Sequence, residues 1–316
     1  MSISTSKLSV IGAGSVGTAL AYAAMIRGSA KVVALQDLNE SKVEAEVLDL
    51  AHGTQFMQAS SIIGGTSQDV TADSDVVVIT AGAKQKPGQT RLDLAEKNVK
   101  ILESMLPGLV ERSPNAVFIL VTNPVDVLTY VATKITGLPA GRVFGSGTVL
   151  DSSRLRWLLG QRLGISARSV HSMIIGEHGD SEFAMWSTAT VGQIPLSNAR
   201  TPDGESFTTE QLDQIERDVR DAAYKVIEGK GATNYAIGVS GARIIEAVLG
   251  DHKAVLPVTS PLHGIAGADD VSISVPSIVG SAGVERTLPL VLNESEEARL
   301  ASSIKALRES IKMVGY

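Results

Sequence analysis

The stretch Leu8-Ser9-Val10-Ile11-Gly12-Ala13-Gly14-Ser15-Val16-Gly17 decides how the first half of the chain folds. Its apolar start, residues 8–11, predicts a strand. Residues 16–27, which include Ala, Leu, Tyr and Met at helix-compatible positions, predict a helix. Between the two lies a G-x-G-x-x-G turn in the strand–turn–helix context that this motif requires. The stretch therefore predicts a dinucleotide-binding unit, with a plain β-turn-α unit as the alternative.

The three glycines have separate tasks in such a turn. Gly12 makes the tight turn, Gly14 lets a pyrophosphate approach the backbone, and Gly17 lets the helix pack on the strand. The helix N-terminus adds free N–H groups and a positive dipole end. A second apolar run, 32–35, leads to Asp37, which lies 20 residues after Gly17. A carboxylate there accepts hydrogen bonds from ribose hydroxyls and repels a 2′-phosphate, so NAD is favoured over NADP.

Strands and helices continue to alternate up to about residue 145. Asn39 is expected to cap a helix, and the strong apolar runs 76–79 and 116–121 are expected to be strands. Such alternation is typical of a doubly wound parallel sheet, in which ligands bind beyond the carboxyl ends of the strands. The segments expected at those ends are 12–17, 80–82 and 122–124, and the remaining predicted elements are a helix at 41–58, a weak strand at 62–63 and a helix at 92–111.

The polar segment 82–91 interrupts this alternation and carries glycines at both 82 and 88. A long polar loop of this kind suits a lid that closes over a substrate and excludes water. A solvated surface loop is the alternative.

The chain after residue 145 has a different pattern, and we expect a mixed α+β domain there. The predicted division is therefore a Rossmann domain at 1–145 and a substrate domain at 146–316. Asp151 or Ser152 is expected to cap the first helix of the second domain. The other predicted elements are a buried strand at 170–175, helices at 208–228 and 234–249, strands at 271–275 and 288–292, and a closing helix at 294–314.

The loop Gly176-Glu177-His178-Gly179-Asp180 holds an imidazole between two carboxylates. Histidine is the side chain whose proton moves near neutral pH, and the flanking glycines let backbone and ligand come close. A strand-to-loop turn with a partly exposed histidine is the alternative. Upstream, Arg154 and Arg156 are about 200° apart around a helix axis, so the two must face different ways.

Composition excludes several classes of function. The net charge of −6 over 316 residues argues against nucleic acid or an anionic membrane as a partner. The absence of cysteine rules out disulfides, a thiol nucleophile and a Cys-metal site, which fits a cytoplasmic protein. We see no signal peptide, and no apolar run reaches the ~18 residues of a membrane helix.

In order and spacing, these motifs resemble the L-lactate and malate dehydrogenase family, most closely its bacterial L-lactate-specific members. The long N-terminal arm of vertebrate members is absent. The resemblance implies a homotetramer that takes part in glycolysis and fermentation by converting pyruvate, NADH and a proton to L-lactate and NAD. It is carried by the segments 12–17, 85–91, 122–126, 151–154 and 176–180, together with Asp37.

The resemblance also assigns residue roles. His178 would donate and accept the proton, with Asp151 orienting its ring, while Arg154 would bind the substrate carboxylate. Arg91 would polarise the ketone oxygen as part of the catalytic set. The implied substrate-binding residues are Gln85, Arg91, Asn123, Asp126, Arg154 and Thr233, and the implied cofactor-binding residues are Gly12, Gly14, Val16, Gly17, Asp37, Lys42, Gly82, Ala83, Ser104, Val121 and Asn123. No metal is implied.

Gln85 bears on the choice between lactate and malate. By resemblance, its position holds arginine in malate enzymes and glutamine in most lactate enzymes. The second carboxylate of oxaloacetate would be buried beside a neutral amide, which is strongly disfavoured. Pyruvate is therefore expected, with a malate-type or 2-hydroxyisocaproate-type enzyme as the alternative. An indifferent loop residue is the alternative for Gln85 itself.

Arg156 and His171 match positions that bind fructose 1,6-bisphosphate between subunits in allosteric bacterial members, so the resemblance implies a possible allosteric enzyme. A surface arginine and a strand-start histidine are the alternative. Two other classes of function compete with the dehydrogenase. A related NAD-dependent glycosidase would need cysteine and histidine for its metal, and this chain has no cysteine. A non-catalytic NAD(H) sensor would not need the set of His178, Asp151, Arg154 and Arg91.

Overall fold

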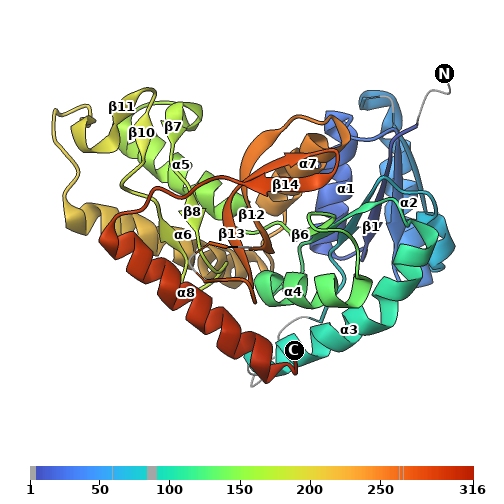
Figure 1. Ribbon diagram of the computed structural model, residues 1–316. Coiled ribbons are helices and arrows are strands. Elements are labelled where there is room, and N and C mark those ends of the chain that lie inside the picture. Colours follow the sequence, from blue (N-terminus) through green and yellow to red (C-terminus); the bar gives the residue numbers. More distant parts are fainter. Residues whose placement is uncertain (1–4, 59, 84–90, 263, 266) are drawn as a thin grey trace.

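A central sheet organises the protein in the computed structural model, which describes residues 5–58, 60–83, 91–262, 264–265 and 267–316. In this part of the chain the sheet has nine strands in the order β14-β13-β12-β6-β5-β4-β1-β2-β3 (Figure 1). The strands β1 to β6 run parallel, and the order reverses between β1 and β4. This is the doubly wound topology predicted from the sequence.

The first half supplies the parallel strands and most of the covering helices. The predicted strands at 8–11, 32–35, 62–63, 76–79 and 116–121 are all confirmed within a few residues. The elements are β1 (Lys7–Ile11), α1 (Ser15–Arg27), β2 (Val32–Gln36), α2 (Glu40–His52), β3 (Ser61–Gly65), β4 (Val76–Ile79), α3 (Arg91–Arg112), β5 (Val117–Leu120), α4 (Val125–Thr136) and β6 (Val143–Gly145).

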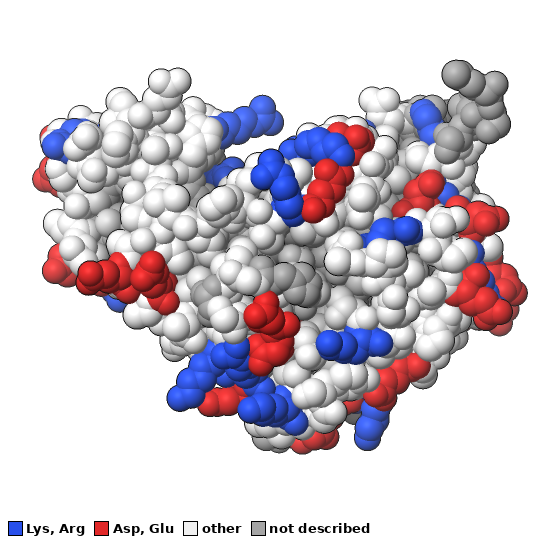
Figure 2. Space-filling model, viewed as in Figure 1, with Lys and Arg blue, Asp and Glu red and all other residues white. Residues whose placement is uncertain are grey.

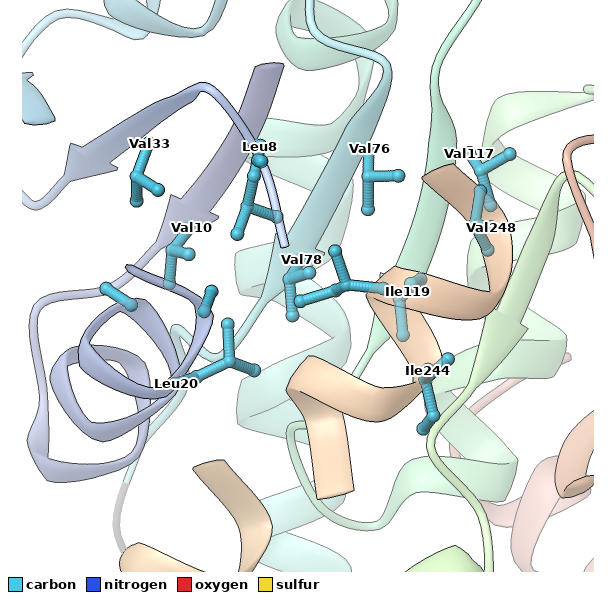
Figure 3. Packing of buried hydrophobic residues seen from close by; sticks show 14 of the residues in the cluster. Leu8, Val10, Leu20, Val33, Val76, Val78, Val117, Ile119, Ile244 and Val248 are labelled. Carbon is cyan, nitrogen blue, oxygen red and sulfur yellow. The ribbon is translucent and has the colours of Figure 1, made fainter. Parts of the chain in front are cut away.

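Alternate side chains of the strands feed two cores on opposite faces of the sheet. On one face, Val10, Val78 and Ile119 belong to one buried cluster with Leu20 of α1 and Ile244 of the later helix α7 (Figure 3). On the other face, the intervening strand residues pack against the apolar sides of α3 and α4. Since β1, β4 and β5 are buried on both faces, they read as largely apolar runs in the sequence.

The second half continues the same sheet instead of forming a separate one. Its strand β12 pairs antiparallel with β6, and β13 and β14 follow, each antiparallel to the strand before it. Its helix α7 packs closely on α1. The elements are α5 (Val149–Leu163), β7 (Val170–His171), β8 (Ile174–Ile175), β9 (Phe183–Ala184), β10 (Thr190–Val191), β11 (Ile194–Pro195), α6 (Thr209–Lys230), α7 (Tyr235–Leu249), β12 (Ala254–Pro261), β13 (Ser272–Gly280), β14 (Gly283–Thr287) and α8 (Glu294–Met313). The mixed α+β character predicted for this half is confirmed.

Two predicted strands are wrong. The run 170–175 is broken into β7 and β8, which belong to different small sheets: β7 pairs with β10, and β8 with β9. The run 288–292 is not a strand, and the final strand β14 lies just before it. Pro289 in that run lacks the N–H that a ladder needs, whereas the more polar β14 suits an edge position.

Two predicted helix boundaries are also wrong. The helix expected at 41–58 ends at His52, where Gly53 begins a separate 3₁₀ turn. The helix expected to be capped by Asp151 or Ser152 begins earlier, at Val149, with Thr148 at the N-cap. Asp151 therefore lies in the first turn of α5, and its carboxylate is available to the centre of the protein.

The surface carries charged side chains of both signs. On the face in Figure 2, basic and acidic side chains are interspersed, with broad uncharged areas between them. None of the helices in the described ranges combines the length and the apolar character needed to cross a membrane.

Candidate active site

The backbone of the histidine loop is fixed by three successive amides, those of residues 176–178. The first amide donates to the carbonyl of Ser274 on β13 at 3.0 Å, and the second donates to Ser303 Oγ on α8 at 2.7 Å. The third, that of His178, donates to Asp126 Oδ2 on α4 at 2.7 Å. Three elements from both halves of the chain thus hold the loop, and the His178 side chain remains 25% exposed.

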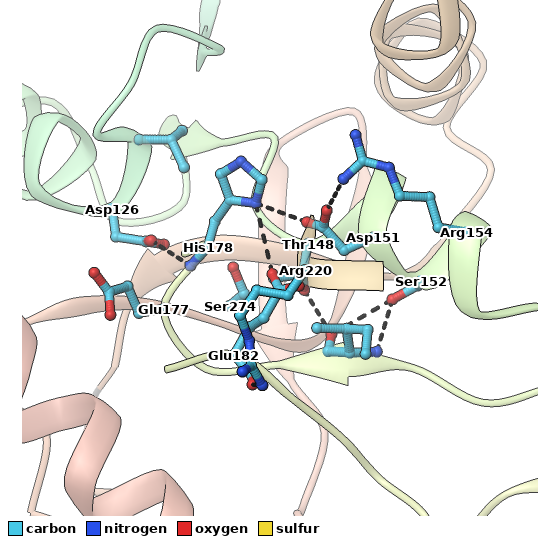
Figure 4. A network of polar contacts seen from close by, with 12 residues as sticks. Asp126, Thr148, Asp151, Ser152, Arg154, Glu177, His178, Glu182, Arg220 and Ser274 are labelled. Carbon is cyan, nitrogen blue, oxygen red and sulfur yellow. Dashed lines mark hydrogen bonds and ion pairs between the residues drawn. The ribbon is translucent and has the colours of Figure 1, made fainter. Parts of the chain in front are cut away.

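Asp151 connects the imidazole to a guanidinium. Its Oδ2 lies 2.7 Å from His178 Nδ1, and its Oδ1 accepts from Arg154 Nη1 at 2.5 Å (Figure 4). The Asp151 side chain is only 1% exposed, so both of its oxygens are used by charged partners. As the sequence predicts, Arg154 and Arg156 diverge, since Arg156 Nε donates instead to the Ser172 carbonyl at 3.0 Å.

These neighbours set the protonation state of His178. Burial alone would lower the pKa of His178, but the charge and hydrogen bond of Asp151, with smaller contributions from Glu182 and Asp126, raise it to about 10. Burial opposes the ionisation of Asp151, yet His178 and Arg154 hold the pKa of Asp151 below its ordinary value. The pair is therefore an imidazolium and a carboxylate at neutral pH, with His178 Nε2 directed away from Asp151 (Figure 4).

A cavity of about 300 Å³ opens in front of this pair. Its polar lining brings together the predicted residues Asn123, Asp151, Arg154 and His178. Its apolar lining comes from the start of α3, the middle of α6 and the end of α8. A small anion with an apolar side chain fits such a lining. Arg154 and His178 can bind its negative charge, and the apolar residues can contact its side chain.

The glycine turn lies at the switch point of the sheet, between β1 and β4. Gly12 has a φ of +101°, a conformation that favours glycine, and a Cβ on Gly17 would overlap the carbonyl oxygen of Gly12. A Cβ on Gly14 would meet no atom within 4 Å, so the space beside Gly14 is open. Asp37 Oδ2 accepts from the Ala13 amide at 2.7 Å and so fixes the turn.

The turn fits the pyrophosphate of a dinucleotide. The N-cap of α1 is Gly14, which provides no side-chain cap, and the first turn of α1 has no acidic residue. The N-terminal amides and the positive dipole end therefore face open space beside Gly14. Asp37, at the end of β2, is the acid that would hold the adenosine ribose.

Asn98 is a structural link that the sequence reasoning missed. This residue of α3 is 1% exposed. Its Oδ1 accepts from the Ala83 amide at 2.7 Å, and its Nδ2 donates to the Asn123 carbonyl at 2.8 Å. It joins the segment after β4 to the segment after β5. The one sequence feature that could have indicated this role is the position of Asn98 next to Val99, on the apolar side of a predicted helix.

Several predicted site residues lie apart from the cavity or remain undescribed. Asp126 is buried and lies behind the histidine loop, and Thr233 lies in the turn between α6 and α7; neither is among the described residues that line the cavity. Gln85 lies outside the described residues, as does the side chain of Arg91, the first residue of α3. The other predicted cofactor residues that the structure describes lie at or beyond the ends of β1, β4 and β5 or on helices: Val16 on α1, Lys42 on α2, Gly82 and Ala83 after β4, Ser104 on α3 and Val121 after β5.

Arg156 and His171 come together at a second cavity, also of about 300 Å³. Arg156 reaches it from α5 and the exposed His171 from β7. The remaining lining is largely apolar, with Met173, Met185 and Val291 among its members. The arginine and the histidine that the sequence singled out are therefore neighbours at one site, separate from the lining of the first cavity.

One cluster in the described residues has atoms spaced for a metal ion. The ligand atoms of Asp151, His178 and Glu182 lie within 4.8 Å of one another. Arg154 already pairs with the negative charge of Asp151. The imidazole Nδ1 lies within hydrogen-bond distance of Asp151 Oδ2. The cluster is therefore better suited to sharing a proton than to binding a metal ion.

The fold and the site together define a class of protein. A dinucleotide-binding sheet whose crevice adjoins an imidazolium and a guanidinium is typical of an NAD-dependent dehydrogenase acting on small anionic substrates. Comparison with family models places this chain more narrowly. Residues 6–145 match the lactate/malate dehydrogenase NAD binding domain, and residues 148–315 match the lactate/malate dehydrogenase alpha/beta C-terminal domain. The chain belongs to the lactate/malate dehydrogenase family.

Individual relatives cover nearly the whole chain. An L-lactate dehydrogenase of Bifidobacterium animalis subsp. lactis is 48% identical over 99% of this chain and 98% of its own length. An L-lactate dehydrogenase of Thermoanaerobacterium saccharolyticum is 46% identical over 98% and 99%. Among solved structures, the minor L-lactate dehydrogenase of Enterococcus mundtii, in its ligands-bound form, has a TM-score of 0.94 at 39% identity and covers 98% of both chains.

The two glycines of the turn give a matched test of the cofactor site. In Gly14→Ala the new methyl group enters open space, so the melting temperature should stay the same while NADH affinity falls by roughly an order of magnitude. In Gly17→Ala the methyl group overlaps the Gly12 carbonyl, so the protein should lose on the order of 1–3 kcal/mol of stability. Fluorescence titration with NADH and thermal unfolding measure the two effects. Unchanged NADH affinity in Gly14→Ala would contradict the assignment.

Proposed function

We propose that this protein is an L-lactate dehydrogenase that catalyses the reversible NADH-dependent reduction of pyruvate to L-lactate. The observation that carries the proposal is the shared carboxylate of Asp151, which holds a charged His178 and Arg154 at one cavity. The L-lactate dehydrogenases that this chain resembles over nearly its whole length support it. The open glycine turn and Asp37 support NAD as the cofactor.

Arg154, His178 and Asp151 have separate roles in the proposed reaction. Arg154 binds the carboxylate of pyruvate through guanidinium N–H groups that its bond to Asp151 leaves over. His178 donates its proton to the ketone oxygen, and Asp151 stabilises the imidazolium before the transfer and orients the neutral ring after it. NADH, when bound, supplies the hydride to the ketone carbon. Proton and hydride together convert the ketone to the alcohol.

The remaining residue roles belong to the same proposal. Asn123 lines the cavity and is available to hydrogen-bond the ketone oxygen. Arg91, Gln85 and Thr233 are assigned to substrate by family resemblance, with Arg91 polarising the ketone. Asp126, which the resemblance also assigns to substrate, accepts a hydrogen bond from the backbone amide of His178. The proposed cofactor set is Gly12, Gly14, Val16, Gly17, Asp37, Lys42, Gly82, Ala83, Ser104, Val121 and Asn123.

Assembly and regulation are also proposed. We propose a homotetramer on the basis of the family resemblance. Several large apolar side chains exposed on the isolated chain are available for subunit interfaces, among them Leu48 and Phe56 near α2 and Ile194 on β11. We further propose that fructose 1,6-bisphosphate binds at the cavity shared by Arg156 and His171, where a guanidinium and an imidazole can donate hydrogen bonds to phosphate. We also propose a role in glycolysis and fermentation and a cytoplasmic location, as the family resemblance implies.

The reaction is tested by following NADH oxidation with pyruvate, oxaloacetate and 2-oxo-isocaproate side by side. We expect the highest kcat/KM with pyruvate. In His178→Gln the turnover should fall roughly 10²–10⁴-fold while NADH affinity is kept, because the ring only moves the proton. If the protein binds NADH but turns over none of the three acids, the result would favour a non-catalytic NAD(H) sensor. A His178→Gln variant that keeps most of its rate would refute the assigned role.

Substrate choice is tested by Gln85→Arg. A guanidinium at this position would pair with the second carboxylate of oxaloacetate, so its turnover should rise while that of pyruvate falls. The measurement is kcat/KM for both acids in both proteins. Equal values before and after the substitution would show that Gln85 does not face the substrate.

The effector site is tested by measuring the KM for pyruvate with and without fructose 1,6-bisphosphate at about pH 6 and about pH 7.5. The effector should lower the KM and should shift sedimentation toward the tetramer. The double variant Arg156→Gln, His171→Gln should lose both responses. No response of the unaltered protein at either pH would eliminate the site.

A further inference from the structure

Glu182 is a buried acid beside the catalytic pair that the proposed reaction does not yet use. Its side chain is 3% exposed and lines the same cavity as His178 and Arg154. Its Oε2 lies 3.9 Å from His178 Nδ1, the nitrogen that also faces Asp151 (Figure 4). The imidazole thus faces two buried carboxyl groups, at hydrogen-bond distance from one and at ion-pair distance from the other.

A chain of fixed charges lies behind Glu182. Arg220 Nη2 contacts the Glu182 carbonyl at 3.5 Å and donates to Glu216 Oε1 at 3.2 Å. Glu216 is itself held by both terminal nitrogens of Arg299 and accepts from the Ala184 amide. Arg220 is therefore kept in place by partners on its far side. Its positive charge stays next to Glu182, and its Nε is buried without a hydrogen-bond partner in the described part of the chain.

The surroundings of Glu182 oppose the ionisation of its carboxyl group. Burial and the neighbouring Asp151 raise the pKa of Glu182 well above its ordinary value, while His178, Arg154 and Arg220 act in the opposite direction. The described charged groups that face this cluster are Asp151 and Arg154 from α5, Arg220 and Glu216 from α6, Asp126 from α4, and Glu177 from the histidine loop.

We propose that Glu182 is a positioning residue of the proposed reaction: with Arg220 behind it, its carboxyl group works with Asp151 to hold the His178 imidazolium in place and to keep it charged as the pH rises. The inference rests on the proposed function and deepens it. When Glu182 loses its proton, its new negative charge favours the charged imidazole, as the contribution of Glu182 to the raised pKa of His178 indicates. The proton donor thus stays charged over a wider alkaline range than Asp151 alone would allow.

The test is Glu182→Gln, which keeps size and polarity but cannot ionise. We expect the alkaline limb of kcat/KM for pyruvate, measured at saturating NADH, to move to lower pH by on the order of one unit. The rate below the limb should stay close to that of the unaltered protein. Glu228→Gln is the matched control, because Glu228 is an exposed acid on α6, and its limb should not move. Glu182→Asp, which keeps an ionisable group, should show a smaller displacement.

Each outcome decides the proposal. A rate that falls equally at every pH, with the limb unmoved, would show that Glu182 is only structural. If Glu182→Gln does not fold, a limb unmoved in Glu182→Asp overturns the proposal, and a limb displaced to lower pH supports it. Titration of the His178 ring by NMR in the NADH complex gives the same comparison without turnover. An unaltered protein inert toward pyruvate would refute the proposed function, while the NMR shift would still test Glu182.

Discussion

The active site depends on the burial of a single negative charge. Asp151 is 1% exposed, and a carboxylate that is removed from water needs charged partners to remain ionised. Arg154 contacts one oxygen of Asp151 and His178 contacts the other. Each of these two partners therefore stabilises the ionised carboxylate, to which the other also binds. The start of α5 at Val149, with Thr148 and not Asp151 at the N-cap, leaves that carboxylate available for this use.

The catalytic imidazole also depends on both halves of the chain. Its loop is held by Ser274 of β13 and Ser303 of α8 on one side, and by Asp126 of α4 on the other. Thr259 of β12 donates to the second oxygen of Asp126 and lies 2.8 Å from the Ser274 hydroxyl. Since the sheet passes from β6 directly to β12, these contacts lie within one continuous framework. A boundary drawn at residue 145 separates segments of sequence that share one site.

Local sequence was sufficient where a signal repeats within a few residues. The glycine turn, the apolar strands and the motif around His178 could all be read directly, and the divergence of Arg154 and Arg156 follows from helix geometry alone. Where partners are distant in sequence, local patterns do not predict the structure. The apolar run 170–175 says nothing of the two sheets that divide it, and the buried position of Asn98 depends on segments 15 and 25 residues away.

The two functional loops are fixed by the same device. Asp37 accepts from the Ala13 amide across 24 residues of sequence, and Asp126 accepts from the His178 amide across 52, each at 2.7 Å. A carboxylate binds a backbone N–H more strongly than a neutral acceptor does, and it fixes a loop without occupying the loop's own side chains. Gly14 and the His178 ring are therefore left free to meet cofactor and substrate. Loops fixed through their backbone in this way can carry reactive groups and still keep their shape.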